Sequence, residues 1–344
     1  PRLTLWPGLF VVLAVTVLIG LPLWSEGFAY NPLFLARQLL PSFAVWTAAC
    51  LLLHLALHRL RHGDWPRPQV ERVLTAAAQI SAAFVLVTLL TTAYSWGKLL
   101  VPHFNPVRWD AAVYRLDVAL HLGLDPGRVL LALFQGAPWL DAAFDFFYQQ
   151  FDLLLLATTA WFISHPDGDQ RARYLRGFVL LWLGGLALYL LVPVLGPVSS
   201  FPELGPELQQ RFPRNYAVEV QLLENYENVA AVLSGASMPV RLEFGIDAMP
   251  SLHVALPAYL FLFFHERRNP LRVLFLVVTF LFLIGSVLTG WHYAVDGYVG
   301  ILLALLCWWS VRDPELATEP AAEPAAPRWF SRGGKDSPKT SSIV

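Results

Sequence analysis

Long apolar runs with few charges recur along the chain, and they constrain its fold more than any other feature. The run at residues 5–24 is about as long as a helix needs to cross a bilayer, which takes roughly 20 residues. Within lipid every backbone N–H and C=O needs an internal partner, so such runs fold as helices. Only 14% of the residues are charged, whereas a soluble domain carries about 25%. The sequence therefore predicts an all-α, polytopic membrane helix bundle.

About eight transmembrane helices are expected. A signal peptide is the alternative for the first run, but that run lacks a small-x-small cleavage site, which favours an anchor that stays. We expect N-terminal transmembrane helices over 1–100, an interfacial segment over 101–138, a catalytic transmembrane core over 139–312 with an outer loop at 198–249, and a disordered cytoplasmic tail over 313–344. The expected spans cover residues 5–24, 39–60, 73–100, 139–164, 174–195, 250–265, 271–289 and 291–311.

Basic residues in three short loops predict the orientation. Arginines follow the second expected span, stand before the fifth, and end the sixth at Arg267-Arg268. Because short basic loops stay in the cytoplasm, both termini are expected there, and the protein is expected in the plasma (inner) membrane. The 101–138 segment, the 198–249 loop and the turn at Gly290 then lie outside. The net charge of −1 argues against nucleic acid as a partner, whereas the bilayer itself is an expected one.

The last two apolar runs are joined by a stretch that carries His292 and Asp296. Residues four apart share one face of a helix. A carboxylate one turn away from an imidazole can hold its N–H, fix its tautomer and stabilise its cation. This is the arrangement that a nucleophilic or general-base histidine needs. The alternative is a buried His–Asp pair that only ties helices together.

His253 is expected to lie level with His292, because Pro250-Ser251-Leu252-His253 begins the sixth span at its outer end. Two histidines at one membrane face suit phosphoryl transfer. His292 would attack phosphorus, Asp296 would orient it, and His253 would protonate the departing oxygen. The Ser251 hydroxyl and nearby N–H groups could hold phosphate oxygens, or the side chain could simply cap the helix. A metal held by His253, His292 and Asp296 is another possibility.

Cations that could hold a phosphate are expected in the outer loop. A phosphate needs positive groups to offset its charge. Arg241, Arg214 and Arg211 are therefore candidates, although loop arginines could equally be solvated.

The span at 139–164 carries a polar stripe. Asp145, Tyr148, Gln149 and Asp152 are spaced by 3, 4 and 7 residues, which places them on one helical face. Acids inside a span normally face the bundle interior or a wet cavity. The stripe predicts a polar wall of a substrate cavity, and an internal hydrogen-bond network is the alternative.

Two motifs resemble signatures of the type 2 phosphatidic acid phosphatase superfamily. Pro250-Ser251-Leu252-His253 is similar to its second signature, and residues 286–296 are similar to its third, Ser-x3-Gly-x-His-x3-Asp. The usual first signature, Lys-x6-Arg-Pro, is absent near the end of the fifth span. Lys98 with Asn105-Pro106 echoes it in a different span and is set aside.

The resemblance covers the last four spans and implies a six-helix phosphatase-like core, a phospho-histidine at His292, and chemistry without a metal or cofactor. The missing first signature and the His-Tyr-x2-Asp pattern resemble a branch that contains inositol phosphorylceramide synthases and, more distantly, the sphingomyelin synthases of sphingolipid metabolism. The favoured prediction is a lipid phosphotransferase of the inositolphosphotransferase type, with a lipid donor and a hydroxyl acceptor. A lipid phosphate phosphatase is the alternative, and a non-enzymatic transporter is less favoured.

Overall fold

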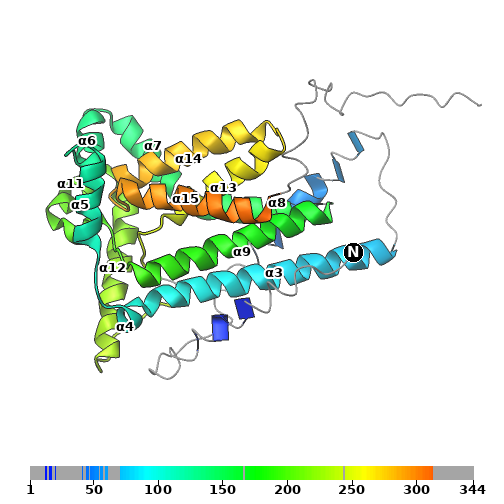
Figure 1. The fold of residues 1–344 in the computed structure, drawn as a ribbon, viewed down its shortest axis with the longest axis horizontal. Helices are drawn as coiled ribbons and strands as arrows, with labels where there is room; N and C mark the ends of the chain where they lie inside the picture. Colours follow the sequence, from blue (N-terminus) through cyan, green and yellow to red (C-terminus); the bar gives the residue numbers. More distant parts are fainter. Residues whose placement is uncertain are drawn as a thin grey trace, which may run out of the picture.

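The computed structural model describes residues 70–312 except 166, 243 and 244, together with scattered positions between 12 and 60. Every regular element in this part of the chain is a helix, which confirms the all-α prediction (Figure 1). The body consists of long helices that run side by side. They are α3 (Val70–Leu99), α9 (Gly168–Leu191), α13 (Leu252–Glu266), α14 (Leu271–Leu288) and α15 (Ala294–Val311).

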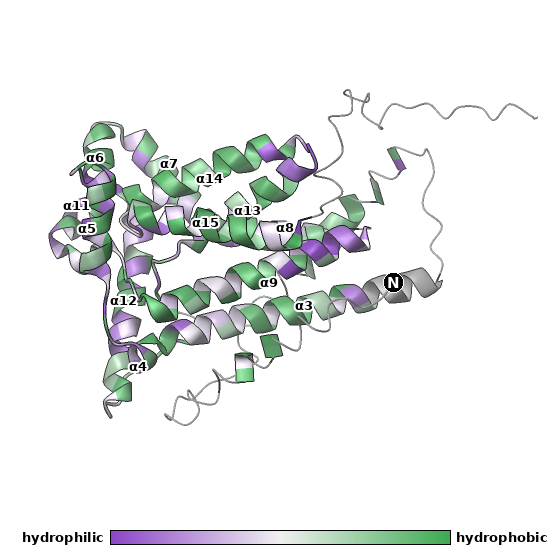
Figure 2. Ribbon diagram, viewed as in Figure 1, coloured by the Kyte–Doolittle hydropathy of each residue, from purple (hydrophilic) through white to green (hydrophobic). Residues whose placement is uncertain are grey.

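The long helices are apolar along most of their length and carry hydrophilic residues toward their ends (Figure 2). Among the described residues, four helices are long and apolar enough to cross a membrane. This confirms a membrane protein, whereas the number eight stays a prediction. The expected spans at 5–24 and 39–60 fall largely outside the described residues, and so does the tail at 313–344. The four spans are Ala78–Leu99, Gly168–Leu191, Leu271–Leu288 and Ala294–Val311.

Short helices gather at one end of the bundle, on the left in Figure 1. The segment at 101–138 forms α4, α5 and α6, which contain 4, 11 and 8 residues and are too short to cross a bilayer. Asp125 begins α6 by accepting the Arg128 N–H at 3.1 Å, and Pro126 occupies the first helical position, where its missing N–H costs nothing. The bounds are Val101–Phe104 for α4, Asp110–Leu120 for α5 and Pro126–Leu133 for α6.

The segment expected as an outer loop at 198–249 is mostly helical. α12 begins at Pro213 inside this expected loop, and it lies across the end of the bundle (Figure 1). It contacts α7 and α4. The elements are α10 (Pro197–Ser200), the 3₁₀ helix η1 (Pro202–Leu204), α11 (Gly205–Arg211) and α12 (Pro213–Leu233).

The span expected over 139–164 is two helices, α7 (Pro138–Tyr148) and α8 (Phe151–Ile163), which corrects the single-helix prediction. Gln149 and Gln150 separate them. The Gln149 amide donates to Asn215 of α12 at 2.7 Å, so a tertiary hydrogen bond holds this break. The apolar periodicity runs through both helices and therefore could not reveal it.

The start of α13 packs closely against α15. A Cβ atom at Gly300 would lie 2.5 Å from the Ser251 carbonyl oxygen, so only glycine allows this approach. α13 also packs along α14, and the three helices form one unit. This packing brings the start of α13, the end of α14 and the start of α15 to the same end of the molecule.

Candidate active site

His292 is held in a tight connection between α14 and α15. Gly290 has a φ of +81°, and a Cβ there would meet a Leu208 methyl carbon at 2.7 Å. The N–H groups of Trp291 and His292 both donate to the Ser286 carbonyl, at 3.0 and 3.1 Å. Gly290 and these two hydrogen bonds therefore hold the backbone at His292 without any contact of the imidazole.

The two ring nitrogens of His292 have different surroundings. Nδ1 lies 2.7 Å from the carbonyl oxygen of Ala248. Because a carbonyl only accepts, Nδ1 carries the proton and Nε2 carries the lone pair of the neutral ring. Nε2 is buried and has no hydrogen-bond partner among the described residues. The imidazole is therefore held in the tautomer that a nucleophile or a base requires.

Asp296 stands farther from the imidazole than the sequence predicts. Its Oδ2 is 3.6 Å from His292 Nδ1, beyond a hydrogen bond, and accepts the Tyr293 N–H at 2.9 Å. The predicted orienting role is thus corrected: the Ala248 carbonyl holds the ring, and the fully buried Asp296 adds its negative charge from nearby. A backbone carbonyl has no sequence signature, which is why Ala248 was missed.

His253 and His292 lie side by side, with ring centroids 5.6 Å apart. The His253 ring stacks on Tyr148 at 4.8 Å and meets Trp291 edge-on at 5.7 Å. Aromatic contacts on both sides therefore limit its rotation. Within the described residues, no group of three or more His, Cys, Asp or Glu side chains is placed to hold a metal ion.

Ser251 immediately precedes α13 and is fully buried. Its N–H donates to the Asp296 carbonyl at 3.0 Å, so that N–H is not free for a phosphate oxygen. The hydroxyl does not cap α13, and it has no partner among the described residues. The Ser251 hydroxyl therefore stays a candidate for holding phosphate, as do the N–H groups at the start of α13.

The arginines proposed from the sequence make contacts elsewhere. Arg211 forms a two-pronged pair with Asp141, at 2.8 and 2.9 Å, and this pair raises the pKa of Arg211. Arg214 is exposed, and its guanidinium lies over the Phe146 ring at 5.9 Å. Arg241 is also exposed. The structure therefore places none of these described arginines against the histidines.

Lys98 at the end of α3 is a cation that the sequence analysis set aside. Its Nζ lies 3.1 Å from Asp247, and both side chains are largely buried. The ammonium interacts electrostatically with His253 and with Asp152. The signal was the Lys98-x6-Asn105-Pro106 spacing, which we discounted because it stands in another span.

The residues of the polar stripe at 145–152 make two kinds of contact. Asp145 accepts the backbone N–H and the side-chain amide of Asn215, at 3.0 and 2.8 Å, and so caps α12. Gln149 donates to the same asparagine. These contacts match the alternative of a hydrogen-bond network and correct the substrate-facing prediction for both residues. Asp152 is exposed and interacts with Lys98.

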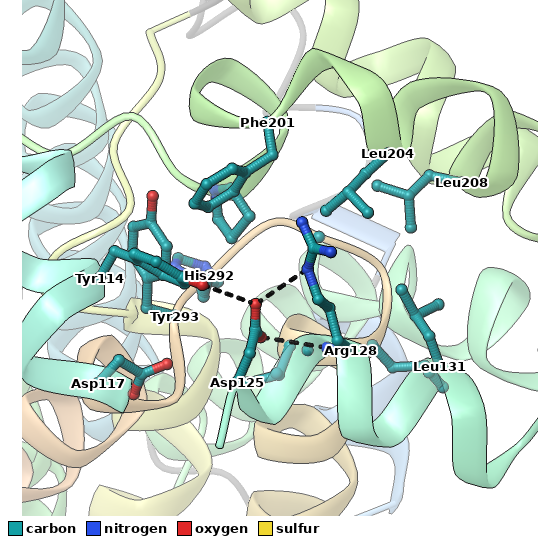
Figure 3. A pocket seen from close by; sticks show the side chains of 15 residues that line it. Tyr114, Asp117, Asp125, Arg128, Leu131, Phe201, Leu204, Leu208, His292 and Tyr293 are labelled. Carbon is teal, nitrogen blue, oxygen red and sulfur yellow. Dashed lines mark hydrogen bonds and ion pairs between the residues drawn. The ribbon is translucent and has the colours of Figure 1, made fainter. Parts of the chain in front are cut away.

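A small cavity lies beside His292. Its volume is about 30 Å³, and across it Asp125 accepts from the Tyr114 hydroxyl and pairs with Arg128 (Figure 3). It has room for one or two water molecules. A wider groove of about 530 Å³ shares Tyr114, Phe201 and Tyr293 with this cavity, but His292 does not line it. The groove is lined by Arg108, Asp110, Ala111, Tyr114, Arg115, Ser199, Ser200, Phe201 and Tyr293.

Asp117 supports the site from α5, and the sequence analysis missed this role. Its two carboxylate oxygens accept the N–H groups of Ala294 and Val295, at 3.2 and 2.9 Å, and thereby cap α15. Burial raises the pKa of Asp117, and the two N–H donors oppose that rise. A cap from another helix leaves no local pattern, because the partners are far apart in sequence.

Comparison with known proteins adds one finding. A family model described as the PAP2 superfamily matches residues 111–310, from α5 to α15. No match was found among curated proteins or among solved structures. The matched region contains Ser251, His253, His292 and Asp296. Because the match covers more than half of the 344 residues, the chain belongs to the PAP2 superfamily and is a phosphatase or phosphotransferase enzyme of the membrane.

Proposed function

We propose that this protein transfers a phospho-headgroup from a lipid donor to a hydroxyl acceptor through a phospho-histidine at His292. One observation carries the proposal. The Nδ1–H of His292 is fixed on the Ala248 carbonyl, while Nε2 is buried and has no hydrogen-bond partner among the described residues, and the imidazole lies beside the His253 ring. A histidine held in this way has one free lone pair in a defined direction, which is the requirement for nucleophilic attack.

The proposed reaction has two steps. His292 Nε2 attacks phosphorus, the bond to the lipid oxygen breaks, and His253 gives that oxygen its proton. In the second step His253 takes the proton of an acceptor hydroxyl, whose oxygen attacks phosphorus while the N–P bond breaks. The Ala248 carbonyl and Asp296 stabilise the positive ring, and Lys98, a largely buried cation that interacts with His253, offsets the charge of the phosphate.

The finer assignments are also proposals. We propose a headgroup of the inositol-phosphate type, as the resemblance to the branch with a missing first signature implies, and an acceptor that offers hydroxyls. We also propose a site at the outer face of the plasma membrane with both termini inside. The Ser251 hydroxyl remains a proposed substrate contact, because it has no hydrogen-bond partner among the described residues. Asp152 remains one because it is exposed and interacts with Lys98. We propose that Arg108 or Arg128, which line the groove and the cavity, binds the phosphate instead of Arg241 and Arg214.

A lipid phosphate phosphatase is the second candidate, because a cavity with room for water borders His292. Purified protein in lipid, incubated with phosphorylated lipids with and without myo-inositol or ceramide, separates the two. A new phosphorylated product that needs both the acceptor and His292, soluble with myo-inositol and a lipid with ceramide, supports the transferase. Free phosphate alone, still dependent on His292, supports the phosphatase, and turnover by His292→Ala contradicts both.

A further inference from the structure

Glu219 on α12 is a buried acid that the proposed mechanism does not use. Its exposed fraction is 1%, and Oε2 has no hydrogen-bond partner among the described residues. Burial holds the pKa of this carboxyl well above its usual range. Buried polar atoms are nearly always paired, so an unpaired acid at this depth requires an explanation.

The neighbours of Glu219 on α12 show where its side chain is directed. Asn215, Glu219 and Leu222 follow at intervals of four and three residues, so they share one face of the helix, and all three are buried. Asn215 is bound to Asp145 of α7. Leu222 belongs to a hydrophobic cluster against which Trp291 packs. Glu219 lies between these anchors and therefore faces α7 and the connection that carries His292.

Two donors on that side are also unpartnered among the described residues. They are the Tyr148 hydroxyl and the Trp291 indole N–H, and both atoms are buried. The two rings are 5.5 Å apart, and each contacts the His253 ring. Tyr148 also interacts electrostatically with Glu219. One acceptor, on Glu219, and two donors thus lie on this side of the molecule, and no hydrogen bond joins any of the three.

The chemistry of these groups selects a class of ligand. A carboxyl group accepts from hydroxyls, while phenol and indole groups donate to them. The aromatic faces suit the apolar face of a saturated ring. Asp247 and Asp152 both lie near Lys98, so on this side of the histidines they would repel a second anionic group.

We propose that Glu219 is a positioning and specificity-determining residue that, with Tyr148 and Trp291, binds the hydroxyls of a neutral polyol acceptor beside His292. This inference rests on the proposed phosphotransfer at His292, and it names the acceptor class and the residue that selects it. Glu219 holds the acceptor and takes no part in the bond changes at phosphorus.

The first test compares wild type with Glu219→Met and with Glu224→Met, an exposed acid of the same helix as the matched control. With myo-inositol as the acceptor, Glu219→Met should raise KM roughly tenfold, the loss expected for one hydrogen bond, because methionine keeps the length of the side chain but lacks the accepting oxygen. Labelling of His292 by the donor should stay unchanged, and Glu224→Met should stay within about twofold on the same scale. An unchanged KM, or an equal loss of labelling, overturns the inference.

The second test needs no turnover. Binding of myo-inositol is measured on His292→Ala, and on His292→Ala combined with Glu219→Met, both checked for a single folded species. Binding that is lost only in the double variant supports the polyol site, even if wild type proves to release free phosphate alone. Equal binding by both variants, or by neither, overturns it. Failure of the proposed phosphotransfer would instead appear as missing acceptor-dependent product with binding retained.

Discussion

At the residue scale, the account depends on the different tasks of the two nitrogens of His292. His292→Asn places an amide N–H near the Nδ1 position, so it can still donate to Ala248, but it has no atom at Nε2. We expect turnover to fall by roughly 10³-fold or more while thermal stability in detergent stays near wild type. Activity within tenfold of wild type would show that another residue attacks phosphorus.

The position of Asp296 leads to a second prediction. Asp296→Asn keeps an oxygen that accepts the Tyr293 N–H but removes the charge 3.6 Å from the imidazole. We expect the rate to fall about 10–100-fold, the effect typical of an outer partner of a functional histidine, with unchanged unfolding temperature. Asp296→Ala serves as the comparison, because it should lower both the rate and the unfolding temperature. An undiminished rate in the asparagine variant would remove Asp296 from the mechanism.

The residues proposed to do the chemistry are easier to find in the sequence than the groups that lie around them. His292, Asp296 and His253 stand in short motifs, so local spacing reveals them. The Ala248 carbonyl cannot be read from side-chain identities, and Lys98 comes from a distant helix. Arg211 looked like a phosphate ligand because the sequence does not show that Asp141 already pairs with it.

At the element scale, α15 depends on a cap from α5. Asp117→Ala leaves the N–H groups of Ala294 and Val295 without their acceptor. We expect a loss of about 0.5–2 kcal/mol in the free energy of unfolding, and a lower rate because His292 stands just before this helix. Asp117→Asn, which keeps one good acceptor, should lose less of both. Equal stability of all three proteins, followed by chemical unfolding, would rule out this role.

Helix positions were predictable where the apolar pattern decides them, as for α9, α14 and α15. The break between α7 and α8 and the start of α12 depend on Asn215, which joins Asp145 and Gln149 across the fold. Such tertiary hydrogen bonds act on the backbone without changing the hydrophobic period. The sequence therefore could not show them.

At the scale of the whole molecule, the raised pKa of Glu219 links stability to pH. The folded state keeps this proton above about pH 4.3, where the unfolded state has lost it. Stability should therefore fall as pH rises from that value toward the raised pKa, by up to about 1.4 kcal/mol per pH unit. Glu219→Gln should flatten this slope and Glu224→Gln should not. Identical pH profiles of melting temperature for all three proteins would contradict a raised pKa of Glu219 in the folded state.

The proposed orientation can be tested by labelling. Glu224 of α12 and Asp169 at the start of α9 are exposed and lie toward opposite ends of the bundle. Both native cysteines, Cys50 and Cys307, are buried, so a thiol reagent should label them only weakly. A membrane-impermeant thiol reagent should label Glu224→Cys in intact cells and Asp169→Cys only after permeabilisation. The reverse pattern would invert the topology.

The central claim is that phosphorus is transferred through His292, and trapping the phospho-enzyme tests it most directly. Wild type, His292→Asn and His253→Ala are incubated with a donor labelled on its phosphate and quenched at high pH, where a phospho-imidazole survives. The account predicts an acid-labile label on His292 in wild type, none in His292→Asn, and release of the wild-type label into the phosphorylated acceptor when the acceptor is added. A label that persists in His292→Asn, or turnover without any labelled protein, would contradict it.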